Sequence, residues 1–179
     1  MTPLVFISYC HSDEQYIDGL CKRFDEAGIS YYIDRNKITW GSLVTDELLN
    51  ALYECIALVV VVSKATSKSQ WVPFEIGHVV GTCAMGANKK ILPLLTDKTN
   101  SVPPYLVNHL RLSTLDEAVG YFQSENWKRH VQESKTWKSN ELTRIKQELF
   151  SKLKKLEDQE REVDLLDQYK SGAKEPEEL

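Results

Sequence analysis

The run Ile56-Ala57-Leu58-Val59-Val60-Val61-Val62 is the clearest β-strand in the sequence. It is apolar throughout, it ends in four consecutive valines, and it is too short for a buried helix. Apolar side chains on both faces are typical of a strand inside a parallel sheet, where helices cover both sides. We therefore predict a buried strand at residues 56–62 and an α/β fold around it.

Short strand-like runs alternate with helical patterns on both sides of this segment. Further strands are predicted at residues 4–9, 29–33 and 91–95, with a short fifth strand at residues 109–112. Helices are predicted from an N-cap at Ser12 to a stop at Gly28, at residues 48–55 and at residues 70–85. Strands separated by single helices are typical of βαβ units, so the pattern predicts a doubly wound parallel sheet.

The pattern changes after about Ser113. Residues 114–138 predict one or two short helices carrying Phe122 and Trp127, and residues 140–167 predict a long helix without Gly or Pro. We therefore divide the chain into a main domain at residues 1–115, a C-terminal helical extension at residues 116–168 and a charged tail at residues 169–179, which we expect to be disordered.

The long helix carries an incomplete heptad pattern. One row of apolar residues recurs every seven positions, at Leu142, Leu149, Leu156 and Val163. The second row holds Ile145 and Leu166 but is interrupted by Lys152 and Gln159. Two interpretations therefore stay open: a helix packed on its own domain, and a helix that joins copies of the chain.

Composition and charge exclude several classes of protein. The chain has 179 residues, 42% hydrophobic and 27% charged, as expected of one globular domain with an appendage. Its net charge of -4 argues against nucleic-acid binding through bulk charge, and its longest apolar run is too short to span a membrane. Four cysteines without CxxC spacing, and no visible secretory signal, predict reduced thiols and a cytoplasmic location.

Familiar motifs for phosphate binding and nucleophilic catalysis do not occur in the sequence. It contains no GxGxxG, no GxxxxGK[ST] and no GxSxG, which argues against a standard dinucleotide-binding domain or a P-loop enzyme. The histidines are not spaced like metal ligands, so no metal site is predicted. Ligands of open parallel sheets bind at the carboxyl ends of the strands, which here selects residues 9–13, 34–43, 63–71 and the residues from 95 onward.

Trp71 and Glu75 are the most informative pair in these segments. They are four residues apart at the start of a predicted helix, so they share one face of it. An indole can stack on a flat heterocycle while a neighbouring carboxylate stabilises positive charge. From the spacing alone, a core Trp with a surface Glu is the commoner arrangement.

Three motifs together resemble the Toll/interleukin-1 receptor (TIR) domain family. The first is Phe6-Ile7-Ser8-Tyr9 followed by Ser12-Asp13, which resembles the family's first box. The second is Tyr32-Ile33-Asp34 with Gly41 seven residues on, which looks like the second strand and its BB loop. The third is Ser69-Gln70-Trp71-Val72-Pro73-Phe74-Glu75, where a Trp precedes an acidic residue by four. The resemblance covers roughly residues 3–115.

This resemblance implies a fold and an activity. The fold would be a five-stranded parallel sheet of flavodoxin-like order with helices on both faces. Many TIR domains cleave NAD+ between nicotinamide and ribose, and in them the residue matching Glu75 is catalytic. NAD+ would then be the substrate, with no cofactor and no metal. A carboxylate there would stabilise the oxocarbenium-like ribose left by nicotinamide, while Trp71 would form a stacking wall.

The same resemblance implies the other residues of the site. Tyr9 and His11 after the first strand, with Asp34, Lys37 and Leu43 around the BB loop, would line the NAD+ pocket. His11 stands at a position where relatives often carry Arg or Ser. Lys37 could meet a phosphate of the substrate or equally face solvent.

The resemblance leaves more than one function open. The first is an NAD+ glycohydrolase or cyclase that gives ADP-ribose or a cyclic ADP-ribose signal. Stand-alone TIR proteins of this size resemble sensor subunits of anti-phage systems such as Thoeris, whose product acts on a separate effector. The second is a non-catalytic adaptor that acts by TIR–TIR assembly. A flavodoxin-like receiver or nucleotide binder is disfavoured because no acidic cluster or phosphate loop follows the first strand. Self-association is expected for either TIR function, with no nucleic-acid or membrane partner.

Overall fold

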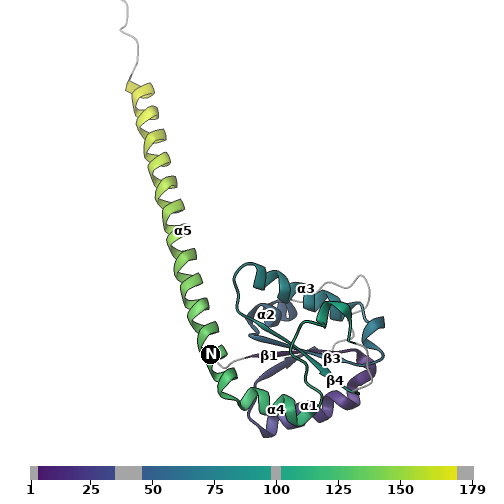
Figure 1. Ribbon diagram of the computed structural model, residues 1–179. Helices are drawn as coiled ribbons and strands as arrows, with labels where there is room; N and C mark the ends of the chain where they lie inside the picture. Colours follow the sequence, from purple (N-terminus) through teal and green to yellow (C-terminus); the bar gives the residue numbers. More distant parts are fainter. Residues whose placement is uncertain (1–3, 35–45, 98–101, 173–179) are drawn as a thin grey trace, which may run out of the picture. The chain divides into compact units, whose positions relative to one another are not determined.

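The computed structural model describes residues 4–34, 46–97 and 102–172, with side chains described as far as residue 163 (Figure 1). Strands and helices alternate along the first part of the chain, and helices alone make up the last part. Their order is β1 (Val5–Ser8), η1 (His11–Asp13), α1 (Glu14–Glu26), β2 (Tyr31–Ile33), α2 (Asp46–Glu54), β3 (Ala57–Val62), η2 (Thr66–Lys68), α3 (Trp71–Ala84), β4 (Lys90–Leu95), η3 (Pro104–Leu106), α4 (Leu115–Gln123) and α5 (Glu125–Gly172).

The strands form one parallel sheet in the order β2-β1-β3-β4. The valine-rich strand β3 lies inside it, where Val59 pairs with Ile7 on one side and with Leu92 on the other. Strand β1, the first in the sequence, also has neighbours on both sides, and the crossover from β2 past β1 to β3 reverses the strand order. The predicted doubly wound α/β sheet is therefore confirmed.

The prediction of five strands was wrong for the described part of the chain, where the sheet has four. At the expected fifth strand, only Leu112 forms a parallel bridge, to Leu94. The hydrogen bonds of the preceding turn continue to His109, whose N–H donates to Leu106. Two residues beyond the bridge, the Thr114 hydroxyl caps α4, which begins at Leu115. Pairing therefore stops after one residue.

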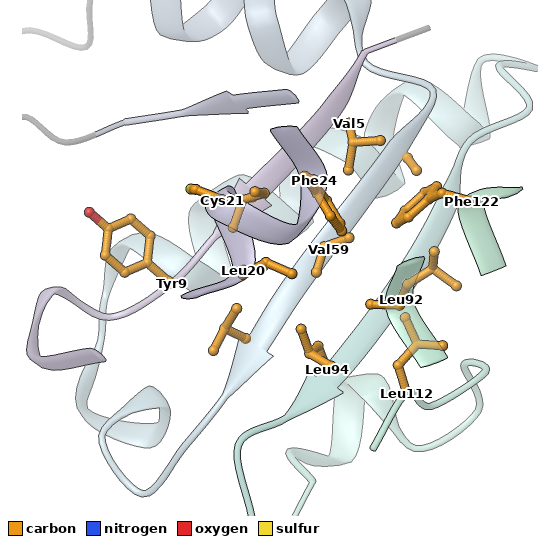
Figure 2. Close-up of a cluster of buried hydrophobic side chains, with 14 of the residues drawn as sticks. Val5, Tyr9, Leu20, Cys21, Phe24, Val59, Leu92, Leu94, Leu112 and Phe122 are labelled. Carbon is orange, nitrogen blue, oxygen red and sulfur yellow. The ribbon is translucent and has the colours of Figure 1, made fainter. Parts of the chain in front are cut away.

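Two apolar cores cover the two faces of the sheet. Alternate strand residues point to opposite faces, so Val59 and Val61 enter one core and Val60 and Val62 the other. One core packs against α1 and α4 and includes Phe24 (Figure 2). The other core packs against α2 and α3, which lie together across the sheet from α1 and α4 (Figure 1). This arrangement explains why the central strand is apolar throughout.

The start of α1 differs from the prediction. Ser12 does not cap the helix, because residues His11–Asp13 first form a 3-10 turn and α1 begins at Glu14. The Ser12 hydroxyl instead donates to the Cys10 sulfur at 3.4 Å. The end of the helix agrees with the prediction, since Gly28 has a φ of 67°, which favours glycine.

The chain divides into two compact units, residues 1–137 and residues 138–179. In the first unit, Phe122 of α4 and Trp127 of α5 belong to the core of the α1 face. His130 Nε2 lies 3.0 Å from the carbonyl oxygen of Ile56, and Ser134 donates to the carbonyl of Asn88. The helix that was predicted to begin near residue 140 therefore begins at Glu125, and its first turns are part of the domain.

The second unit consists of the rest of α5, which is helical to Gly172. Its described side chains are mostly exposed, including those of Leu142, Leu149 and Leu156. Within the residues that the structure describes, no helix combines the length and the apolar character needed to cross a membrane.

Candidate functional site

A small pocket lies at the carboxyl ends of β1 and β2, beside the start of α3. Its volume is about 110 Å³. Five of the residues expected at the site line it together: Tyr9, His11, Asp34, Trp71 and Glu75. Ile7, Cys10 and Ser69 also line it; none was named as a site residue, although Cys10 and Ser69 lie in the segments that the strand ends select. The two remaining expected residues, Lys37 and Leu43, lie outside the described residues.

The helix α3 carries the carboxyl group of Glu75 into this pocket. Val72, Ile76 and Val79 are buried on the α2–α3 core, which fixes the rotation of the helix about its axis. Pro73 lies in the first turn, where the missing N–H costs no helical hydrogen bond. Glu75 is therefore held beside the sheet, and its side chain is only 7% exposed.

Ser8 is the hydrogen-bond partner of Glu75. Its hydroxyl donates to Oε2 of the carboxyl group. Ser8 is fully buried at the end of β1, on the same side of the strand as Phe6, which packs in the α2–α3 core. Sequence reasoning missed this residue, although a lone polar residue ending a buried strand is a signal that could have found it.

Burial raises the pKa of Glu75 to about 8, because the ionised form loses its hydration. The hydrogen bond from Ser8 lowers this pKa, and the nearby charge of Asp34 raises it. At pH 7 the carboxyl group therefore mostly keeps its proton. A cation placed beside it would favour the ionised form. A buried carboxyl group with a raised pKa in a pocket is a candidate for catalysis.

Trp71 forms another wall of the pocket. It is half-buried at the first position of α3, and its ring lies edge-on to that of Phe74, with centroids 5.7 Å apart. The commoner arrangement of a core Trp and a surface Glu is thus reversed, because Glu75 is the buried member of the pair. The two side chains line one small space, as their spacing of four predicts.

Tyr9 and His11 form the side of the pocket that follows β1. Tyr9 is buried, and its ring lies edge-on to the His11 imidazole at 5.5 Å between centroids. His11 is only partly buried, and its Nδ1 is 4.0 Å from a carboxylate oxygen of Glu14. The imidazole therefore lies at the rim, where it can contact a ligand without being part of the core.

A hydrogen-bonded network ties together the two loops that frame the pocket. The Ser63 hydroxyl donates to the Asp13 carboxylate at 2.7 Å, which links the segment after β3 to the segment after β1. The backbone N–H of Ser63 donates to the Thr66 hydroxyl, and that hydroxyl donates to the carbonyl of Val61. This network fixes the path of the chain that leads to Ser69 and Trp71. Among the described residues, no three His, Cys, Asp or Glu side chains gather as they would around a metal ion.

Comparison with protein families identifies the domain. The sequence model of the TIR domain matches residues 5–133, which is most of the chain. The chain belongs to the TIR family. This family includes NAD+-cleaving enzymes and non-catalytic adaptors. No protein with a curated description matches the sequence significantly.

Solved TIR structures are similar to this chain at low sequence identity. A metazoan TIR-STING receptor from C. gigas is 20% identical with a TM-score of 0.53, covering 67% of this chain and 40% of that one. The TIR domain of the Toll-related receptor TRR-2 from Hydra magnipapillata is 21% identical with a TM-score of 0.45, covering 72% and 97%. The TIR domains of the activated Roq1 resistosome are 20% identical with a TM-score of 0.47, covering 77% and 80%. The first of these similarities supports the shared fold.

Proposed function

We propose that this TIR domain is an NAD+ glycohydrolase or cyclase, with Glu75 as its catalytic residue. The observation that carries the proposal is the buried carboxyl group of Glu75 in a pocket whose wall is the Trp71 indole. Such a pair suits a flat, positively charged heterocycle, because the indole offers a face for stacking and the carboxylate offers a negative charge. The nicotinamide ring of NAD+ has both properties.

The main requirement of this reaction is to stabilise the positive charge that develops on the ribose as nicotinamide leaves. The bond between the nicotinamide nitrogen and the ribose carbon breaks, and its electron pair leaves with nicotinamide as a neutral base. The ribose becomes an oxocarbenium-like ion, which an ionised Glu75 stabilises through its charge or through the ribose hydroxyls. Water then adds at the ribose carbon and loses a proton, or a nitrogen of the adenine adds there to close a ring.

The protonation state of Glu75 fits this sequence of events. With a pKa of about 8 it keeps its proton at neutral pH until a cation arrives. The pyridinium charge of NAD+ would lower this pKa and release the proton to solvent. Ser8 then serves as a positioning residue, because its hydrogen bond holds Oε2 and favours the ionised form. Tyr9, His11 and Asp34 would line the substrate pocket, and we extend this proposal to Lys37 and Leu43.

The biological setting is part of the proposal. We infer that the chain acts in the cytoplasm, that copies associate through TIR–TIR contacts, and that its activity rises on assembly. A cyclic ADP-ribose product would signal to a separate effector, as in anti-phage defence. A specific activity that does not change with protein concentration would argue against the assembly step.

The experiment that tests the proposal is incubation of the concentrated purified chain with NAD+, with products separated by chromatography and identified by mass. The Glu75→Gln variant removes the charge and keeps the shape of the side chain. Glu26→Gln is a matched control, because Glu26 is exposed at the end of α1 and away from the pocket residues. Nicotinamide release that is lost only in Glu75→Gln supports the proposal. Intact NAD+ at every concentration, or equal turnover in all three proteins, would favour the non-catalytic adaptor.

A further inference from the structure

The second half of α5 presents an exposed apolar stripe that is not part of the candidate site. Its six members are exposed by between 39% and 60%. They follow one another at steps of three or four residues until a last step of seven: Leu142, Ile145, Leu149, Leu153, Leu156 and Val163. At 3.6 residues per turn these positions share one side of the helix, so they form a continuous stripe. An exposed apolar stripe of this kind marks an interaction surface.

The spacing of the stripe indicates another helix as its partner. Leu142, Leu149, Leu156 and Val163 recur every seven residues, which is the repeat that keeps two supercoiled helices in contact. Opposite the stripe the helix is polar, with Gln147 and Ser151 among its exposed residues. The helix is thus one-sided over more than three turns.

The charges beside the stripe favour a second copy of the same helix in parallel. In a parallel, in-register pair, each residue that directly precedes a seam position repeating every seven residues lies close to the other copy. It faces the residue four positions after the same seam position of that copy. Glu141 would then face Lys146 of the second copy, and Lys155 would face Glu160. Opposite charges at these positions stabilise the pair and select its orientation.

An antiparallel pair fits the charges less well. With Val163 opposite Ile145 of the other copy, Lys146 would face Glu160, but Lys155 would face its own counterpart and Glu148 would face Glu162. Like charges in those positions oppose association. Within each helix, Arg144 already bonds to Glu141 and Glu148, which supports the helix itself in either orientation.

We propose that the α5 stripe pairs with the same stripe of a second copy of this chain in a parallel, in-register coiled coil. Both helices would then start at the same end, so the two TIR domains would be tethered close together at a high effective concentration. Lys152 faces its counterpart in this pair, which limits its stability and makes the assembly sensitive to concentration. This inference does not depend on whether the domain cleaves NAD+.

The test measures the mass of the full chain in solution over a wide range of concentrations, by sedimentation and light scattering. Leu149→Lys with Leu156→Lys places charges in the seam and should weaken association by about 100-fold or more. The matched control, Gln147→Lys with Ser151→Lys, adds the same charge to the polar side and should leave association unchanged. Lysine and leucine have similar helix propensities, so circular dichroism should show equal helix content in all variants.

A gain of association complements the loss, because a variant that fails to fold would not form the discrete dimer expected here. Lys152→Leu removes the repulsion and extends the apolar seam, so it should tighten association by about tenfold or more. Oxidation should link two copies through Gln159→Cys, which faces itself in the parallel pair, and not through Gln147→Cys. A chain that stays monomeric at every concentration, as it would if the stripe packed on its own domain, would overturn the proposal. Association that the seam variants leave unchanged would overturn it equally, and would indicate contacts elsewhere.

Discussion

The buried proton of Glu75 should make the stability of this domain fall as the pH rises. The folded state holds this proton with a pKa of about 8, against an ordinary value of 4.5. The folded protein therefore binds the proton more tightly than the unfolded chain does, and each pH unit between these values costs about 1.4 kcal/mol. Stability from this group is fully present below pH 4.5 and is lost as the pH rises to about 8.

The Glu75→Gln variant isolates this effect. Glutamine does not titrate, and its oxygen can still accept the hydrogen bond of Ser8. Relative to the variant, the wild-type protein should lose about 4 kcal/mol of unfolding free energy between about pH 5 and about pH 9. This is a large share of the about 5–15 kcal/mol that stabilises a typical domain. Other titrating groups are common to both proteins, so they cancel in the difference.

Urea unfolding followed by circular dichroism, at a fixed protein concentration and at each pH, measures the difference directly. Glu26→Gln serves as the control, because an exposed carboxyl group should give a flat difference. Asp34→Asn should recover part of the loss, since the charge of Asp34 raises the pKa of Glu75. A Glu75→Gln difference that stays constant within about 1 kcal/mol from about pH 5 to about pH 9 would refute the buried, protonated state.

Substitutions at three further residues test other parts of the structure. Ser8→Ala removes a hydrogen bond that lowers the pKa of Glu75, so NMR titration of the Glu75 carboxyl carbon should give a pKa above that of the wild-type protein; an unchanged or lower value would contradict the role of Ser8. Trp71→Ala should raise the KM for NAD+ about tenfold through lost stacking while Trp71→Phe has a smaller effect, and equal KM values in all three proteins would count against a stacking wall. Burial lowers the pKa of His130, so the wild-type protein should lose stability relative to His130→Gln as the pH falls below about 6.5; urea unfolding that shows a constant difference would mean that His130 is solvated.

The sequence predicted the parts of the fold that depend on burial on both sides. The valine run of β3 allowed only one structure, and the alternation of strands and helices predicted the parallel sheet. The missing fifth strand could not be predicted from residues 109–112 alone, because the neighbouring segments limit it: a turn continues to His109, and α4 begins at Leu115. Thr114 and Glu117 cap the start of α4 together, which leaves only Leu112 paired with β4.

The sequence predicted most residues of the candidate site, but not their burial or the hydrogen bond between Ser8 and Glu75. The spacing of Trp71 and Glu75 placed both on one side of α3, and both line the pocket. It could not predict that Glu75 would be the buried member, because the rotation of α3 is set by its contacts with the α2–α3 core. Ser8 was missed because its partner is 67 residues away in the sequence.

In α5, too, the sequence predicts what depends on neighbouring residues, but not every contact with residues far away along the chain. Composition predicted a long helix at residues 140–167, and the structure confirms a helix there but begins it earlier, at Glu125. The first turns of α5 join the domain because Trp127 packs in the core of the α1 face and His130 contacts the carbonyl oxygen of Ile56, far away along the chain. The partner of the remaining stripe depends on a second molecule, so it stays a prediction.

The most direct measurement is nicotinamide release from NAD+ by concentrated wild-type, Glu75→Gln and Glu26→Gln proteins under identical conditions. We expect release by the wild-type and Glu26→Gln proteins and none above background by Glu75→Gln. The mass of the second product would then distinguish ADP-ribose from a cyclic form. Release by Glu75→Gln at the wild-type rate, or intact NAD+ with all three proteins, would contradict a catalytic Glu75 and favour the assembly adaptor.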